Sequence, residues 1–291
     1  MCDDEFKISS ELHLQSEVDR TANPSLSQEN VVTRFTFRLS KDLSFIEGHK
    51  DAEVDEDGDF ILQRRDSTSQ DGFLLIEQKS STPLELVGLQ VWRGALLLSD
   101  FLLHSGKTSL SGHTVLELGA GAGLSSIVAA MFAHEVVSTD IDTEEILELI
   151  WANKERNKKW IKSKFSVMGF DFFAKKWSSE LEEKLREVTT ILAADVIYDN
   201  DLTEAFVDSL AKLLVVPPAK TVYVALEKRF VFTVADLDCV APCYEHFLQC
   251  LSNIQRKPPG SNWTVEQLAI DFPQYFNYER VKELVLWKIS S

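Results

Sequence analysis

A glycine-rich turn is the segment of this sequence whose residue types and spacing could do chemistry. The apolar run Val115–Leu118 is followed by Gly119–Gly123 (GAGAG) and then by residues that favour a helix. Glycines in such a turn let the backbone bend sharply and let a ligand approach the main-chain amides closely. The order of strand, glycines and helix therefore predicts a cradle for a nucleotide-type cofactor.

Two details of this turn favour S-adenosylmethionine over a dinucleotide. The dinucleotide fingerprint Gly-x-Gly-x-x-Gly would place its third glycine at position 124, where this chain has Leu124. Glu117 lies two residues before the first glycine, and its negative charge suits a cationic ligand but would repel a pyrophosphate. We therefore predict that S-adenosylmethionine, with S-adenosylhomocysteine as the product, is bound by Glu117, Gly119, Ala120 and Gly121.

Acidic and aromatic residues after the next two apolar runs supply the other contacts that an adenosine needs. Asp140 ends the run Val136–Thr139, where a carboxylate can accept hydrogen bonds from both ribose hydroxyls. Asp171 could accept a hydrogen bond from the exocyclic amine of the adenine, and Phe172 could stack on its ring. The alternative is that Phe170 and Phe172 only fill the core at the end of a strand.

A second acidic and aromatic pair follows the fourth strand. Asp195 and Tyr198 come directly after the run Thr190–Ala194, and ligands in open α/β sheets bind outside the carboxyl ends of the strands. We predict that both side chains face the substrate. The alternative is a helix cap, a role that Asn200 and Asp201 could fill equally well. Glu227, at the end of the fifth strand, shares this edge and is a weaker substrate candidate.

Alternating strand and helix patterns must position these residues. Such regular alternation predicts a doubly wound, mostly parallel α/β sheet. The capping-box pattern Thr82-Pro-Leu-Glu85 predicts one helix from Thr82 to about His104. The expected strands are 114–118, 136–139, 165–168, 190–194 and 221–226, and the helices between them are 124–133, 143–157, 178–186 and 203–214.

The two ends of the chain depart from this alternation. After a helix at 238–254, apolar pieces at 266–270 and 283–289 predict an antiparallel hairpin at the sheet edge. Residues 1–30 are polar and expected to be disordered or loosely attached, and residues 31–81 read as a β-rich extension with strands at 31–39, 60–62 and 73–77. Residues 82–291 then form the main domain. The acidic turn 51–59 does not have the glycine position of a calcium loop.

Composition limits the partners. The 291 residues include 46 acidic and 30 basic side chains, a net charge of −16. This excess disfavours binding to nucleic acid and favours a basic protein partner, which the acidic residues before position 82 could help to recruit. No apolar run is long enough to span a membrane and the first residues are acidic, so we expect an intracellular monomer without a membrane contact.

The cysteines do not indicate a disulfide framework or a metal centre. Three of the four crowd into one segment with a histidine, at Cys239, Cys243, His246 and Cys250. Structural zinc sites usually have C-x2-C or C-x4-C knuckles on turns, whereas these residues share a predicted helix. We therefore predict reduced thiols and no metal site.

The same residues carry a family resemblance. Over about residues 73–291 the chain resembles the family-16 seven-strand methyltransferases, which modify lysine in proteins, through Val91-Trp92, Glu117–Gly123, Asp140 and Ala194–Tyr198 (ADVIY). The resemblance implies a Rossmann-like, seven-strand class I methyltransferase fold, nuclear residence and a nuclear nucleic-acid-binding protein as the candidate substrate. It also implies that the cofactor is lined by Trp92, Gly119–Gly121, Asp140, an aromatic at Phe172 and Ala194, with Asp195 and Tyr198 on the substrate side.

Several points stay open at the level of sequence. Many relatives carry Trp where this chain has Phe172, which can stack on adenine but has no indole N–H. An RNA or small-molecule methyltransferase would share the cofactor site, although Asp195-x-x-Tyr198 differs from the Asn-Pro-Pro-Tyr motif of base-amine methylation. A catalytically inactive binding module is a further alternative, which the intact Glu117, Asp140 and Asp195 disfavour. Whether Asp195 is a strict general base is also open.

Overall fold

A seven-stranded sheet forms the centre of the computed structural model, which describes residues 7–15, 30–39, 70–233, 238–256, 258 and 260–291. The strand order is β10-β11-β7-β6-β3-β4-β5, in which the last five strands are parallel and β11 and β10 are antiparallel. The bounds are β3 (Thr114–Leu118), β4 (Glu135–Asp140), β5 (Lys164–Gly169), β6 (Val188–Ala194), β7 (Thr221–Glu227), β10 (Thr264–Leu268) and β11 (Leu284–Ser290). The predicted α/β class and the antiparallel hairpin are confirmed, with β10 as the edge strand.

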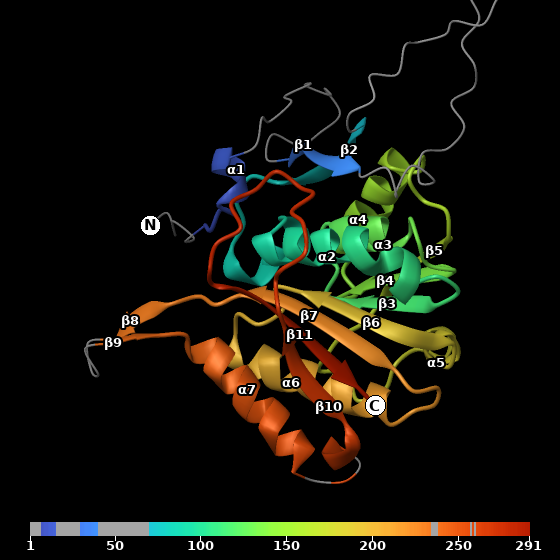
Figure 1. Cartoon of the computed structure of the whole chain (residues 1–291), viewed down its shortest axis with the longest axis vertical. Helices are drawn as coiled ribbons and strands as arrows, with labels where there is room; N and C mark the ends of the chain where they lie inside the picture. Colours follow the sequence, from blue (N-terminus) through green and yellow to red (C-terminus); the bar gives the residue numbers. More distant parts are fainter. Residues whose placement is uncertain (1–6, 16–29, 40–69, 234–237, 257, 259) are drawn as a thin grey trace, which may run out of the picture.

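Helices cover both faces of this sheet, as Figure 1 shows. Parallel strands are buried on both faces, and every residue of β3 is accordingly buried. One face carries α2 (Arg93–Ser109), α3 (Leu124–Ala129) and α4 (Glu144–Arg156). The other carries α5 (Ser179–Leu185), α6 (Asn200–Leu214) and α7 (Pro242–Gln255), which is followed by the 3₁₀ helix η3 (Gly260–Asn262). This architecture brings the carboxyl ends of the parallel strands to one edge.

The single helix predicted from Thr82 to about His104 is wrong. A 3₁₀ helix, η2 (Leu84–Leu89), ends before the extended residues Gln90–Trp92, and α2 begins only at Arg93. Thr82 does not cap η2, because its hydroxyl accepts a 2.7 Å hydrogen bond from the Gln90 side chain. Gln78 accepts a 2.8 Å hydrogen bond from the backbone N–H of Val91. These two hydrogen bonds stabilise the extended segment Gln90–Trp92 between η2 and α2, and the apolar periodicity of the sequence does not reveal them.

Apolar composition in this region reflects a core position. The stretch Leu84–Ser109 is long and apolar enough to cross a membrane by composition alone, but 83% of an apolar 18-residue segment within it is buried inside the protein. Such burial is expected of segments packed against the central sheet of a three-layered α/β domain.

Two further helix predictions need correction at their starts. The helix expected from Asp238 begins at Pro242, because residues 238–240 form β9, which pairs with β8 (Val231–Thr233). Proline suits the first helical position, since its missing N–H would have no partner there. Helix α6 begins at Asn200, and its cap is Asp199, which accepts a 2.9 Å hydrogen bond from the N–H of Leu202. Neither Asn200 nor Asp201 takes that role.

The N-terminal extension packs onto the main domain. Strands β1 (Asn30–Leu39) and β2 (Gln70–Lys79) form an antiparallel pair, and the backbone of β2 donates hydrogen bonds to Asn153 of α4 and to Asn157, the C-cap of α4. Residues 7–15 also pack, through the bridge of Ile8 to Thr82 and the buried Leu12 at the start of α1 (Leu12–Gln15), although sequence reasoning treats residues 1–30 as loosely attached. The strand expected at 60–62 and the acidic turn 51–59 lie outside the described residues.

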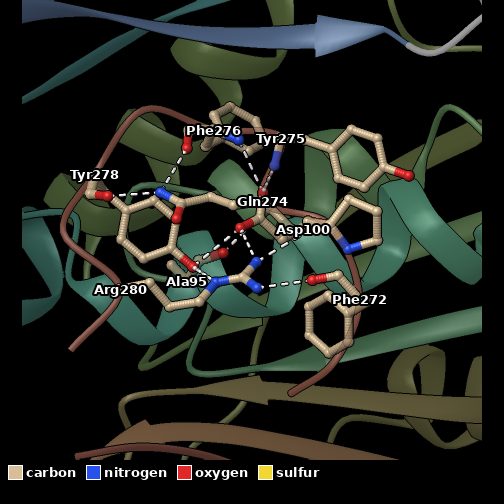
Figure 2. Close-up of polar contacts among 10 residues, drawn as sticks. Ala95, Asp100, Phe272, Gln274, Tyr275, Phe276, Tyr278 and Arg280 are labelled. Carbon is tan, nitrogen blue, oxygen red and sulfur yellow. Dashed lines mark hydrogen bonds and ion pairs between the residues drawn. The ribbon is translucent and has the colours of Figure 1, made fainter. Parts of the chain in front are cut away.

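A buried carboxylate fastens the connection between β10 and β11 to helix α2. Asp100 is fully buried and accepts two 2.8 Å hydrogen bonds from the backbone N–H groups of Tyr275 and Phe276, one 3.0 Å bond from the Tyr278 hydroxyl and one 2.6 Å bond from Arg280 (Figure 2). A buried charge is stable only when it is paired and hydrogen-bonded, as here. These hydrogen bonds hold the connection between β10 and β11 against α2.

Candidate active site

One cavity of about 620 Å³ lies at the carboxyl edge of the parallel strands. It is bounded by η2 and the start of α2, and by the segments that follow β3, β4, β5 and β6. Ten of the residues that the sequence predicts to contact the cofactor or the substrate line this cavity: Trp92, Gly119, Ala120, Gly121, Asp140, Asp171, Phe172, Ala194, Asp195 and Tyr198. The sheet register thus brings together residues that are up to 106 positions apart (198 − 92).

The turn after β3 requires glycine for two separate reasons. Gly119, Gly121 and Gly123 have φ values of 66°, 56° and 80°, a left-handed conformation that other residues adopt at a cost. A Cβ atom on Gly121 would also lie 2.7 Å from the backbone oxygen of Gly88 in η2. The turn therefore presents bare main chain to the cavity, which is the property that a close-fitting ligand needs.

Asp140 holds this turn as well as lining the cavity. Its Oδ2 atom accepts a 2.8 Å hydrogen bond from the N–H of Gly121, and its Oδ1 atom accepts one of 2.8 Å from Ile141. Burial raises the pKa of Asp140 to about 6, although these two hydrogen bonds lower it. Each carboxylate oxygen can accept two hydrogen bonds, so one acceptor site on each oxygen stays available to a ligand.

Glu117 is not among the residues that line the cavity. Its side chain is fully buried behind the turn and accepts hydrogen bonds from the hydroxyls of Ser125 and Ser126. Burial raises the pKa of Glu117 to about 7, and the serine hydrogen bonds lower it by less. The structure therefore places Glu117 behind the turn and not at the cavity wall, where the sequence predicts it. It ties β3 to the first turn of α3 because the two serines, which sequence reasoning passed over, face inward.

The aromatic segment after β5 serves both the core and the cavity. Phe172 lines the cavity and also makes edge contacts with Phe206 at 5.5 Å and Phe170 at 5.8 Å between ring centroids. Asp171 accepts a 2.8 Å hydrogen bond from the N–H of Phe173, which fixes its carboxylate at the cavity wall. Phe172 therefore packs in the core and also presents its ring to the cavity, while its stacking on an adenine stays a prediction.

Asp195 connects three elements. Its Oδ2 atom accepts a 2.5 Å hydrogen bond from the N–H of Gly94 in α2, and its Oδ1 atom accepts one of 3.0 Å from the N–H of Glu227 at the end of β7. Its φ of 54° is unusual for a residue other than glycine, and such strain persists only where the surroundings enforce it. Burial raises the pKa of Asp195, while the nearby Arg229 lowers it. The carboxylate is thus held rigidly at the cavity wall.

The neighbours of Asp195 differ in what they can do. Burial, followed by the charges of Asp140 and Asp199, raises the pKa of Tyr198 to about 12, so its phenol stays neutral and can donate or accept one hydrogen bond. Glu227 does not line the cavity, because its carboxylate is paired with Arg93 at 3.1 Å. The guanidinium of Arg229 lies over the ring of Trp92, with 4.7 Å between the Cζ atom and the ring centroid.

The charge around the cavity has one sign. Among the described residues, six acidic side chains line it and no lysine or arginine does: Glu85, Asp140, Glu145, Asp171, Asp195 and Asp199. Sequence reasoning missed Glu85 and Glu145, because η2 and the start of α4 are folded over the turn and nothing in their local pattern indicates this. It also missed Asp199, the cap of α6. A low-dielectric cavity with such walls concentrates cations.

Comparisons with known proteins agree with this geometry. The family model described as "Lysine methyltransferase" matches residues 69–251. Methyltransferase-like protein 22 of Mus musculus is 38% identical over 252 residues, covering 80% of this chain and 63% of that protein, and its Homo sapiens counterpart is 37% identical over 252 residues, covering 80% and 61%. Protein N-lysine methyltransferase METTL21A of Mus musculus is 37% identical over 129 residues, 44% of this chain and 54% of that protein. The chain spans about three fifths of the length of the first two relatives.

Proposed function

The chain belongs to the lysine methyltransferase family, and from this premise we propose that it transfers a methyl group from S-adenosylmethionine to a lysine side chain of a protein. The observation that carries the proposal is the cavity with six acidic side chains and no basic one beside the glycine turn. Both reactants arrive as cations, one as a sulfonium and the other as an ammonium. A negative cavity attracts both and disfavours a pyrophosphate.

The residues around the turn fit the cofactor. Gly119 and Gly121 leave no Cβ between the main chain and a ligand, and the free acceptor sites of Asp140 suit the two ribose hydroxyls. Phe172 offers a ring and Asp171 an acceptor at the wall where an adenine would lie. The chemistry supplied by the bound cofactor is a methyl group on a good leaving group, open to displacement by a neutral amine.

The chain's own residues must deliver the lysine as that neutral amine. The pKa of a free lysine is about 10.4, so it is almost wholly protonated at neutral pH. Contact with the apolar faces of Trp92 and Tyr198 lowers this pKa, because burial disfavours the charged form. Asp195 first attracts the ammonium, and each of its oxygens retains one acceptor site for an ammonium N–H.

Asp195 and Tyr198 then divide the remaining work. The fixed Asp195 carboxylate orients the nitrogen, and the proton leaves through its Oδ atoms, which burial makes more basic. The neutral Tyr198 hydroxyl accepts a hydrogen bond from the amine and limits its rotation. Positioning of this kind provides most of the acceleration when the leaving group is already good.

A basic protein is the substrate class that the net charge of −16 supports, since opposite charges speed the encounter. Nuclear residence and a nuclear nucleic-acid-binding substrate stay predictions. An RNA or small-molecule substrate would use the same cofactor contacts, so the test must distinguish the acceptors.

Labelled S-adenosylmethionine should be incubated with the protein and a cell extract, with and without RNase. We expect label in a protein band that survives RNase, and hydrolysis of that band should give methylated lysine. The Asp195→Ala variant controls for methyl transfer by other enzymes in the extract. Label that disappears with RNase, or no label beyond the Asp195→Ala level, would overturn the proposal.

A further inference from the structure

Three potential metal ligands meet between α6 and α7, outside the cavity. The Nε2 atom of His246 is 3.0 Å from Oε1 of Glu204 and 3.7 Å from Sγ of Cys250. The three ligand atoms all lie within 4.8 Å of one another. A carboxylate oxygen, an imidazole nitrogen and a thiol sulfur at such separations are three ligand atoms of types that one zinc ion can share.

Helix geometry explains why these side chains meet. Glu204 and Asp208 are four residues apart on α6, and His246 and Cys250 are four residues apart on α7, so each pair projects from one face of its helix. The two faces oppose each other, because Glu204 contacts His246 and the charges of both acids act on the Cys250 thiol. Pairs at this spacing are a common way for helices to bind a metal.

Donor types and distances both fit zinc. Bonds of roughly 2.0–2.1 Å to nitrogen, 2.3 Å to sulfur and 2.0–2.2 Å to oxygen in a tetrahedral site imply separations of about 3.5 Å between N and S and about 3.4 Å between N and O. The observed separations of 3.7 Å and 3.0 Å lie within about 0.4 Å of these values. Calcium and magnesium prefer oxygen ligands alone, which this thiol and imidazole do not provide.

We propose that Glu204, His246 and Cys250 bind one zinc ion, with a water molecule in the fourth position. The ion would tie α6 to α7, close to the start of α6 at Asp199, which lines the cavity. This proposal revises the expectation of no metal. That expectation weighed only the spacing within residues 239–250, whereas the third ligand comes from a helix about 40 residues earlier in the chain (246 − 204 = 42).

Zinc binding to the full chain tests the proposal directly. After removal of metal with a chelator and dialysis, titration calorimetry with zinc chloride should give one site with a Kd of about 1 µM or tighter. Zinc at a hundredfold excess over Kd should raise Tm by roughly 5 °C. Cys250→Ala and His246→Ala should each weaken binding at least tenfold. The matched control is Cys243→Ala, on the same helix but outside the cluster, and it should leave Kd unchanged.

Two further measurements guard against a folding defect or an adventitious ion. Glu204→Gln changes an exposed side chain, with 62% of its surface accessible, so it should fold normally and still weaken zinc at least tenfold. Cobalt in place of zinc should show a thiolate-to-metal absorption band that Cys250→Ala removes and Cys243→Ala retains. A zinc Kd unaffected by Glu204→Gln, or a cobalt spectrum without the thiolate band, would overturn the proposal. No readout here depends on methyl transfer.

Discussion

The Oδ2 atom of Asp195 accepts a 2.5 Å hydrogen bond from the backbone N–H of Gly94, which lies in the first turn of α2. A Cβ atom at position 94 would lie 2.5 Å from that oxygen, so only glycine allows the approach. The first N–H groups of a helix have no partner within it and carry partial positive charge. The carboxylate is therefore held at the cavity wall by a helix N-terminus, and the nearby positive charge of Arg229, which does not line the cavity, also favours its ionised form.

Replacing Asp195 should stop methyl transfer without preventing cofactor binding. We expect Asp195→Ala to reduce turnover at least 100-fold, because it removes the group that we propose orients the amine and accepts its proton. Calorimetry with S-adenosylmethionine should show a Kd within tenfold of the wild type. The control is Asp201→Ala, an exposed acid in the first turn of α6, which should keep turnover. Undiminished turnover in Asp195→Ala would refute the assignment.

Replacing Asp140 should instead act on cofactor affinity. Asp140→Ala loses both the acceptor sites for a ribose and the hydrogen bond that holds the N–H of Gly121. Loss of charge-assisted hydrogen bonds worth about 1.5–3 kcal/mol predicts a Kd weaker by roughly 10- to 100-fold. The control is Asp142→Ala, an exposed acid two residues further along that does not line the cavity. Equal calorimetric Kd values for both variants would contradict this role.

Two glycine substitutions separate backbone strain from a steric clash. Gly121→Ala and Gly112→Ala both place a side chain on a left-handed residue, with φ values of 56° and 78°. Only the Cβ at 121 has a close neighbour, the Gly88 oxygen at 2.7 Å, and nothing lies within 4 Å of the Cβ at 112. We expect Gly112→Ala to cost about 1–2 kcal/mol and Gly121→Ala to cost roughly 1–3 kcal/mol more.

Urea denaturation of both proteins would measure the difference. The Gly121→Ala variant should also bind S-adenosylmethionine poorly, since the turn must shift away from η2. Equal free energies of unfolding for the two variants would mean that the contact between the turn and η2 is looser than the structure indicates.

Glu117 should make stability depend on pH. Its pKa rises from 4.5 to about 7 on burial, so the folded state binds the proton more tightly than the unfolded state does. The resulting stability is fully present below about pH 4.5 and is lost as the pH rises through about 7, a change of about 3 kcal/mol. Glu117→Gln removes this ionisation. Between about pH 5 and pH 8 its free energy of unfolding should fall less than that of the wild type. If urea denaturation gave the same pH dependence of the free energy of unfolding for both proteins, the raised pKa of Glu117 would be refuted.

Truncation tests a role for the N-terminal residues that composition does not indicate. The Gln90 side chain accepts a 2.7 Å hydrogen bond from the N–H of Ser10 and donates one of 3.0 Å to the carbonyl of Ile8, so residues 8–10 brace the break that carries Trp92 into the cavity. Removing residues 1–15 should weaken S-adenosylmethionine binding about tenfold, since each buried hydrogen bond is worth about 1 kcal/mol.

The matched control is a chain lacking only residues 1–6, which keeps both contacts and should keep the wild-type Kd. If instead the two truncations bind the cofactor equally well but methylate a basic substrate more slowly at low salt, recruitment by negative charge would be the better explanation.

Local chemistry sufficed for much of the site. The glycines directly follow the apolar run that ends at Leu118, and Asp140 directly follows the next apolar run. The hairpin predicted from 266–270 and 283–289 follows from two apolar runs without a long helix between them. The position of Asp195 after a strand predicts the edge of the sheet on which it lies. Such features depend on neighbours within a few residues, where backbone preferences act.

What depended on distant partners was invisible in the sequence. The charge and position of Glu117 predict a ligand contact, yet its carboxylate is buried and accepts hydrogen bonds from two serines of α3. The break at Gln90 exists because Gln78 and Ser10 supply hydrogen bonds from outside the helix, and Glu204 meets His246 only once α6 packs on α7. Periodicity predicts which face of an element is buried. Tertiary packing decides which polar groups meet there, since a buried polar group must find a partner wherever the fold provides one.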